Sequence, residues 1–214
     1  MYYFQLLLLL FISLPVSHAI AEQEWELKRD RDGIQVYTRS VEGSKHKAVK
    51  AEMTVPQGVN ELVGLVMDTD ACPEWAALCK SSQITEQVSE TELYVYTWND
   101  LPWPVKDRDA VAKVNWHQDS SGIVTMTAEL TTGKVAEDKK ALRLTEGTTS
   151  WTFHPSAEGT RIVSEAHLDP GGATPAWLTN MLLVDSPFDT MVGMRDLVAT
   201  GKYSDAAFDF LTSE

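Results

Sequence analysis

The fold class that this sequence predicts is α+β: a curved antiparallel β-sheet whose apolar face is covered by one long C-terminal helix. Two patterns predict it. Several segments after residue 33 alternate between apolar and polar residues, which is typical of strands with one buried and one solvated face. The segment 175–198 instead repeats apolar residues every three or four positions, which is typical of a helix.

The first 21 residues predict a secretory signal peptide. They contain no Lys, Arg, Asp or Glu, residues 6–14 form an apolar block, and Ala19-Ile20-Ala21 is a small-x-small site ahead of Glu22. An uncleaved membrane anchor is the alternative, because the usual basic residue near the N-terminus is missing. We expect residues 1–21 to be the signal peptide and residues 22–214 to form one exported domain.

The charge of the chain argues against one class of partner. The sequence has 31 acidic residues against 18 Lys and Arg, which gives a formal net charge of −13. Such a surface repels phosphate backbones, so we expect no nucleic-acid partner. Anionic membranes would not attract it either, but apolar insertion stays open, and transient membrane contact remains among the expected partners.

The N-terminal third combines strands and helices. Residues 25–30 predict a short helix that ends in a turn. Residues 34–41 and 47–55 alternate between apolar and polar side chains and are joined across Gly43-Ser44, which predicts a half-buried hairpin. Pro56 ends the second strand, and apolar residues at helical spacing then predict a helix over 58–69.

A pair of cysteines lies in a second predicted short helix, 72–79. Cys72 and Cys79 are the only cysteines of a chain that we expect to be exported, so we predict a disulfide between them. In one unbroken helix they would stand ~10 Å apart along the axis, beyond bridging reach. Pro73 and the polar run 80–82 indicate breaks that would bring them together. The pair has too few ligands for a metal site, and we predict none.

The middle of the chain predicts an antiparallel meander. Strands resume from residue 82, are interrupted by Leu101-Pro102-Trp103-Pro104, and continue with the same alternation. The clearest of them cover 93–98, 110–117, 124–130, 150–154 and 161–168. A twisted sheet of about seven or more strands curls around whatever covers its apolar face.

The C-terminal helix has an apolar face wider than a coiled-coil seam. Pro187 lies within the pattern and should kink or interrupt the helix, since proline lacks a backbone donor. One such helix of ~24 residues is ~36 Å long and cannot fill a deep concave sheet alone. Either bulky side chains close the gap, so that 175–198 is a plain core helix, or an internal hydrophobic cavity remains.

Residues with catalytic potential are sparse. No Gly-x-Ser-x-Gly elbow and no phosphate-binding Gly-rich loop occurs in the sequence. The carboxylate pairs lie in or after predicted turns, and we interpret them as solvated loop charges. Arg108 and Asp109 lie between a Pro-Trp-Pro turn and a hydrophobic strand, and we interpret them as a structural ion pair. Thr97, Ser164 and Tyr96 are the polar candidates for a cavity lining.

The order of these features resembles the START domain family of steroidogenic-acute-regulatory-related lipid-transfer proteins. The similar segments are Gly33-Ile34-Gln35-Val36-Tyr37-Thr38-Arg39, Cys72-Pro73-Glu74-Trp75, Pro102-Trp103-Pro104-Val105-Lys106-Asp107-Arg108-Asp109 and Asp169-Pro170-Gly171-Gly172. Together they cover about residues 24–200. The resemblance implies a helix-grip fold, in which the curved sheet wraps the C-terminal helix around a lipid-sized tunnel. The signal peptide predicted for residues 1–21 departs from the well-known members of the family, which are cytosolic, and indicates a bacterial periplasmic or secreted setting.

The resemblance further implies binding or transport of a hydrophobic molecule without chemistry or cofactors, in a tunnel gated by the C-terminal helix. Asp169-Pro170-Gly171-Gly172-Ala173 is the expected hinge of that gate. Some family members carry a buried Arg six residues beyond the motif Arg. Here that position is Val114, so a charged anchor of that kind is absent.

We therefore expect a monomeric carrier of a lipid or another hydrophobic ligand. A cyclase-like or hydrolase-like enzyme on the same fold is the alternative, and a protein-binding module is a third. The apolar and small polar residues on the predicted inner faces are the candidate ligand contacts. They are Val114, Trp116, Met126, Trp151, Phe153, Ser164, Trp177, Met181, Phe188 and Met191.

Overall fold

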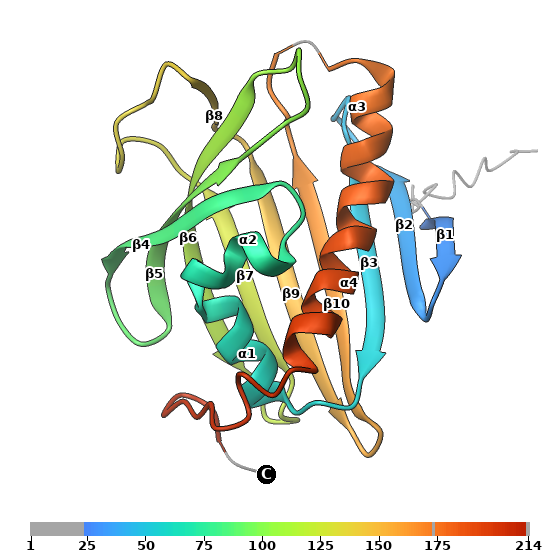
Figure 1. Cartoon of the computed structure of the whole chain (residues 1–214), viewed down its shortest axis with the longest axis vertical. Coiled ribbons are helices and arrows are strands. Elements are labelled where there is room, and N and C mark those ends of the chain that lie inside the picture. The colour runs from blue at the N-terminus through green and yellow to red at the C-terminus, as the bar shows by residue number, and fades with distance from the viewer. Residues whose placement is uncertain (1–23, 173, 213–214) are drawn as a thin grey trace, which may run out of the picture.

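The computed structural model describes residues 24–172 and 174–212. One twisted sheet curves around the C-terminal helix, and two further helices cover the same concave face (Figure 1). The strands are β1 Glu26–Arg31, β2 Ile34–Ser40, β3 Lys47–Val55, β4 Cys79–Gln87, β5 Glu92–Asn99, β6 Asp107–Gln118, β7 Val124–Leu130, β8 Ala141–Leu144, β9 Gly147–Ser156 and β10 Gly159–Leu168. The helices are α1 Val59–Met67, α2 Cys72–Trp75, α3 Ala176–Asn180 and α4 Ser186–Val198.

The sheet order is β1-β2-β3-β10-β9-β7-β6-β5-β4, with every neighbour on this path antiparallel. β8 lies off the path and pairs with β6 in parallel. The last strand of the meander, β10, therefore lies beside the N-terminal hairpin, and the two halves of the chain form one surface. This arrangement confirms the predicted α+β class and the predicted curved antiparallel sheet.

Two elements differ from the prediction. The segment predicted as a short helix over 25–30 is instead the edge strand β1, because pairing with β2 provides backbone partners that overrule local preference. The short parallel strand β8 was not predicted. It carries only four residues, and its pairing with β6 depends on a long loop folding back rather than on a local turn.

The C-terminal helix continues past Pro187 without a break. Between α3 and α4 the backbone forms a π-helical turn, Met181–Asp185, and Pro187 lies in the first turn of α4. The π-helical turn directly before Pro187 changes the regular hydrogen-bond pattern at the point where the proline lacks an N–H donor. The predicted interruption is therefore wrong, and a change of helix type takes its place.

Packing under the C-terminal helix is densest along its second part, α4. Phe188, Met191, Met194 and Val198 are buried, at the helical spacing that the sequence predicts. Beneath this half lies a core that includes Phe153, whose ring stacks on that of Trp116 with centroids 6.4 Å apart. No residue of the π-helical turn is buried, although Leu178 of α3 before it is fully buried. The N-terminal half of the C-terminal helix therefore packs less closely on the sheet, and we call it the lifted half.

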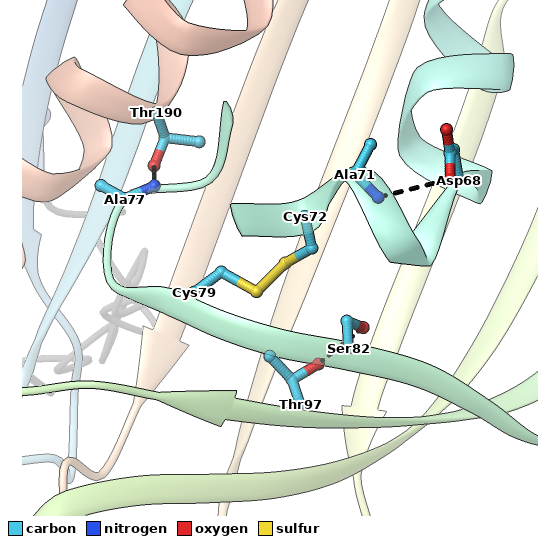
Figure 2. The surroundings of a disulfide bond; sticks show 8 residues. All are labelled: Asp68, Ala71, Cys72, Ala77, Cys79, Ser82, Thr97 and Thr190. Carbon is cyan, nitrogen blue, oxygen red and sulfur yellow. Dashed lines mark hydrogen bonds between the residues drawn. A yellow bond between two sulfur atoms is a disulfide. The ribbon is translucent and has the colours of Figure 1, made fainter. Parts of the chain in front are cut away.

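The predicted disulfide between Cys72 and Cys79 is present (Figure 2). α2 ends at Trp75, and the chain turns so that Cys79 begins β4 with the two Cα atoms 6.0 Å apart. The turn places Leu78 at a positive φ of 67°. Thr190 of α4 accepts a hydrogen bond of 3.1 Å from the Ala77 N–H, which connects this turn to the C-terminal helix.

The predicted signal peptide, 1–21, lies outside the described residues. Within the described part of the chain, no helix has both the length and the apolar character needed to cross a membrane.

Removing the disulfide tests its contribution to stability. The double variant Cys72→Ser/Cys79→Ser should lower the free energy of unfolding by about 2–3 kcal/mol, because the unfolded chain loses a short covalent loop. Urea denaturation followed by circular dichroism measures this loss. The wild type with its disulfide reduced should match the variant, and equal stability of the oxidised wild type and the variant would contradict the prediction.

Candidate functional site

An internal cavity of about 940 Å³ lies between the concave face of the sheet and the lifted half of the C-terminal helix. Its volume falls near the top of the range of ~300–1,000 Å³ that is usual for small-molecule sites. The sheet contributes inward residues of β2, β3, β9 and β10, and the helix contributes residues on both sides of the π-helical turn. The sequence left open whether a cavity remains under the helix, and the structure contains one.

Apolar side chains form most of the cavity wall. Val49 and Ala51 alternate along β3, and Ala166 faces Val49 across the β3–β10 pair. On the helix side, Leu182 and Leu183 line the cavity although they are consecutive. In a regular α-helix consecutive side chains point about 100° apart. The cavity therefore borders a broad sector of the helix at the π-helical turn.

Three of the ten predicted ligand contacts line this cavity: Trp151, Ser164 and Met191. The other seven lie outside this lining, and ligand contact stays a prediction for all ten. Five of them belong to the buried core cluster: Val114, Trp116, Met126, Phe153 and Phe188. Met181 is half-buried outside the wall, and Trp177 is exposed. Alternation identified the concave face of the sheet correctly, but the cavity borders only one end of that face.

The cavity also has a polar lining that the prediction missed. Lys28, Lys45, His46, Lys47 and Arg108 all contribute to the wall. The sequence did indicate one of these residues. Side chains alternate along a strand, so Lys47 lies on the same face of β3 as Val49 and Ala51. The expected polar candidate Ser164 lines the cavity, whereas Thr97 and Tyr96 do not.

Arg108 and Asp109 do not pair with each other, which corrects the predicted ion pair. They are consecutive residues of β6, so their side chains point to opposite faces of the sheet. Arg108 faces the cavity and donates from Nε to the Pro170 carbonyl at 2.6 Å and from Nη2 to the Gly171 carbonyl at 3.1 Å. It also donates to the Lys106 carbonyl.

Asp109 instead pairs with Arg143 of β8 on the other face of the sheet. Arg143 Nη2 donates to Asp109 Oδ2 at 2.8 Å, and the two side chains are 4% and 1% exposed. The Tyr96 hydroxyl donates to the same oxygen at 3.1 Å. Burial, and then the neighbouring Asp109 carboxylate, raises the pKa of Tyr96 to about 12. Arg143 also donates to the Val135 carbonyl, which holds the loop before β8 against the sheet.

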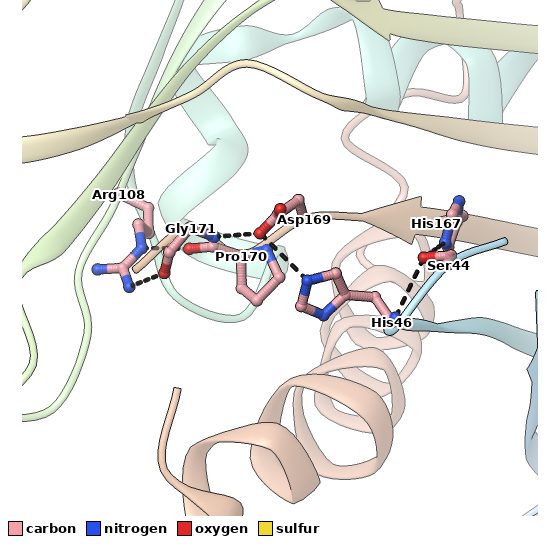
Figure 3. Close-up of polar contacts among 7 residues, drawn as sticks. All are labelled: Ser44, His46, Arg108, His167, Asp169, Pro170 and Gly171. Carbon is pink, nitrogen blue, oxygen red and sulfur yellow. Dashed lines mark hydrogen bonds and ion pairs between the residues drawn. The ribbon is translucent and has the colours of Figure 1, made fainter. Parts of the chain in front are cut away.

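Two loops meet where the C-terminal helix begins (Figure 3). His46 Nε2 lies 3.3 Å from Asp169 Oδ1, and His167 Nε2 lies 3.0 Å from the Ser44 hydroxyl. Asp169 also accepts a hydrogen bond of 2.8 Å from the Gly171 N–H, and this contact, followed by His46, lowers the pKa of Asp169. We call residues 169–172 the entry segment. It is held from one side by Arg108 and from the other by the β2–β3 loop.

The entry segment coincides with the predicted hinge, apart from Ala173, which lies outside the described residues. Gly171 and Gly172 both have positive φ values, 67° and 64°, which residues with a side chain adopt rarely. At Gly171 a Cβ atom would also meet the Leu142 side chain at 2.8 Å. Both glycines are therefore required by the path of the backbone, and hinge motion at this segment stays a prediction.

Comparison with known proteins now decides the family. Residues 17–205 match the START domain family. The chain belongs to this family. An uncharacterized protein of Pseudomonas aeruginosa is 31% identical over 180 residues, which cover 84% of this chain and 88% of that protein.

Solved structures of this START protein's relatives have the same fold. A STAR-related lipid transfer protein from Xanthomonas axonopodis superposes with a TM-score of 0.76 at 30% identity, over 82% of this chain and 98% of that one. Human StAR-related lipid transfer protein 5 gives a TM-score of 0.76 at 16% identity, over 83% and 87% of the two chains. The Zhui aromatase/cyclase of a Streptomyces species shares only the fold, with a TM-score of 0.50 at 13% identity over 75% and 98%.

Breaking the buried pair on the outer face should strongly destabilise the protein. Arg143→Met leaves the Asp109 carboxylate buried without its cation and should cost about 3–5 kcal/mol of unfolding free energy. The double variant Asp109→Leu/Arg143→Met removes both charges and should lose less than the single variant. Urea denaturation measures both. A double variant that is less stable than the single one would contradict this account.

Core and cavity positions on β9 should respond differently to truncation. Phe153→Ala should lower the unfolding free energy by about 3–5 kcal/mol, because the ring is fully buried. Trp151→Ala opens onto an existing cavity and should cost less. Denaturation of both variants beside Val88→Ala, an exposed control expected within ~0.5 kcal/mol, gives the comparison. A larger loss for Trp151 would identify it as ordinary core.

Proposed function

We propose that this START protein binds a lipid or another hydrophobic small molecule in the cavity and carries it between locations. The main observation behind the proposal is the cavity itself. It provides about 940 Å³ of mostly apolar space inside a START domain. The apolar walls at β3, β10 and the lifted half of the C-terminal helix supply the driving force, since burial of apolar ligand surface is favourable.

The proposed role is that of a carrier, and an enzyme is the alternative. The ionisable side chains of the cavity wall are those of four Lys and Arg residues and His46, without any Asp or Glu. General acid–base catalysis usually needs two groups with different proton affinities close to the reacting atoms. Among the residues of this wall, His46 is the single histidine, and no carboxylate accompanies it. The composition of the wall therefore favours binding over chemistry.

The proposed route into the cavity passes the entry segment and the N-terminal part of the C-terminal helix. Both Thr179 and Asn180 line the cavity while being exposed to solvent, so the wall reaches the surface there. Outward movement of α3 and the π-helical turn would widen this opening, because none of the side chains of that turn is buried. Gating of this kind operates in many proteins through short hinges that absorb backbone rotation.

Transient contact with a membrane is part of the proposal. Trp103, in the β5–β6 loop, is 90% exposed, and Trp177, in α3, is 48% exposed. Tryptophan is enriched at membrane–water interfaces, where its ring lies at the level of the lipid headgroups. We further propose that the protein acts as a monomer after export to a periplasm or secretion, in line with the signal peptide predicted for residues 1–21.

A ligand that co-purifies would test the proposed function directly. Native mass spectrometry of protein purified without added ligand should reveal a hydrophobic molecule, and organic extraction should release it. The variant Ala166→Phe adds a ring to the cavity wall and should abolish that binding while the protein stays folded. The control Thr148→Phe adds the same ring at an exposed position of β9 and should retain the ligand.

Two results would contradict the carrier proposal. One is a protein that contains no hydrophobic molecule and binds none of a panel of fluorescent lipids. The other is ligand binding that persists unchanged in Ala166→Phe, which would place the ligand outside this cavity.

A further inference from the structure

The charges that line the cavity are all of one sign, and this sign is opposite to that of the whole protein. The chain has 31 acidic residues against 18 Lys and Arg. The cavity wall nevertheless includes three Lys and one Arg, together with His46, and neither an Asp nor a Glu. A wall drawn at random from this composition would carry more acidic than basic residues. No acidic residue of the wall balances this positive charge, and an anionic ligand in the cavity would balance it.

Arg108 is the most deeply buried of these cations, with 6% of the residue exposed. Its partners are the carbonyl oxygens of Pro170, Gly171 and Lys106, and among the described residues it has no ion pair. The neighbouring Asp107 carboxylate is engaged elsewhere, by Trp98 Nε1 at 2.7 Å and the Leu101 N–H at 3.2 Å.

A buried guanidinium without a carboxylate is costly. A charge taken out of water needs a counter-charge to compensate its lost hydration. Consistently, burial lowers the pKa of Arg108, and the nearby Asp107 carboxylate opposes this shift without cancelling it. The three carbonyls use one N–H on each nitrogen of the guanidinium, which leaves two of its five N–H donors without a partner among the described residues. An anion in the cavity could accept from these two.

The remaining cations come from β1 and from the β2–β3 hairpin. Lys28 and Lys47 share Glu26, with N–O distances of 2.5 and 4.0 Å, and His46 lies beside Asp169. These carboxylates are not part of the wall, whereas the cations are, and Lys45 and Lys47 among them are also exposed to solvent. Figure 3 shows His46 and Arg108 on opposite sides of the entry segment, which places both at the same end of the cavity.

A buried hydroxyl lies close to this end. Thr38 of β2 lines the cavity, is 2% exposed, and its Oγ1 has no hydrogen-bond partner among the described residues. Thr38 pairs with Val49, one inward position from the Ser40–Lys47 pair. An unpaired buried hydroxyl usually indicates a missing partner, and a polar atom of a ligand would supply it.

We propose that the ligand is an anionic amphiphile: an aliphatic chain in the apolar part of the cavity and one carboxylate or phosphate group at the cationic end, beside Arg108. This inference rests on the proposed function and narrows it to a ligand class. Arginine suits such a group because its planar N–H donors match the geometry of carboxylate and phosphate oxygens.

A set of ligands with one chain and different head groups tests this inference. Hexadecanoate, hexadecyl phosphate, hexadecanol and hexadecyltrimethylammonium are titrated into the delipidated protein, below their aggregation concentrations, by isothermal titration calorimetry. At least one of the two anions should bind about tenfold or more tightly than the alcohol, and the cation should bind most weakly. The ratio of carboxylate to phosphate affinity tells which kind of head group the site prefers.

Variants locate the head group. Lys45→Gln/Lys47→Gln and Arg108→Gln should each lower the ratio of the affinity for the preferred anion to the affinity for hexadecanol severalfold. Arg108→Lys, which retains the charge, should keep part of the preference. The control Lys139→Gln/Lys140→Gln makes the same charge change in the exposed loop before β8 and should have no effect. If Arg108→Gln does not fold, the lysine variant decides.

The outcomes separate this inference from the proposed function. Equal affinities for the anions and the alcohol, or an anion preference that survives both the lysine and the Arg108 variants, would overturn the anionic ligand and leave the carrier role intact. Failure of all four ligands and of the fluorescent lipids to bind would overturn both.

Discussion

The packing of α4 against the concave face of the sheet determines where a cavity can exist. Phe188, Met191, Met194 and Val198 bury the C-terminal half of the helix. Gly193 allows this close approach, because a Cβ atom there would meet the Trp75 carbonyl oxygen at 2.4 Å. α2 and the helix are thus in backbone contact at one end. The change to a π-helical turn lifts the other end, and the space beneath it remains open.

Side chains on both faces of β6 stabilise this arrangement. On the inner face Arg108 holds the entry segment through its carbonyl oxygens, and on the outer face Asp109 holds β8 and the preceding loop through Arg143. The two charges are buried on opposite faces, and among the described residues only Asp109 has an ion-pair partner, Arg143. Asp109 therefore forms a structural ion pair with Arg143, whereas Arg108 is part of the cavity wall.

The alternation of side chains was sufficient to predict most of the strands and the C-terminal helix. It failed at β1, where the sequence Glu26-Leu27-Lys28-Arg29-Asp30-Arg31 carries too few apolar residues to mark a face, because an edge strand is exposed on both sides. It also could not locate the cavity. Whether Phe153 or Trp151 borders empty space depends on how far the helix lies above each, and this distance has no local signal.

Other features of the site could have been predicted from the sequence. The strand predicted over 110–117 begins three residues too late. With the observed start at Asp107, alternation places Arg108 and Asp109 on opposite faces and excludes an ion pair between them. The same rule placed Lys47 inside the cavity. The resemblance to START domains drew attention to Val114 and to the missing charged anchor there. The structure has Arg108 on the cavity wall, at the start of the same strand.

The two ends of the sheet order, β1 and β4, each have one side without a partner strand among the described residues. Such edges can pair with another chain and start aggregation. Both edges here interrupt that pairing. Each has irregular register, between Leu27 and Arg29 in β1 and at two places in β4, and five of the six residues of β1 are charged. The sheet can thus stay open around its helix without offering a continuous flat edge to a second copy.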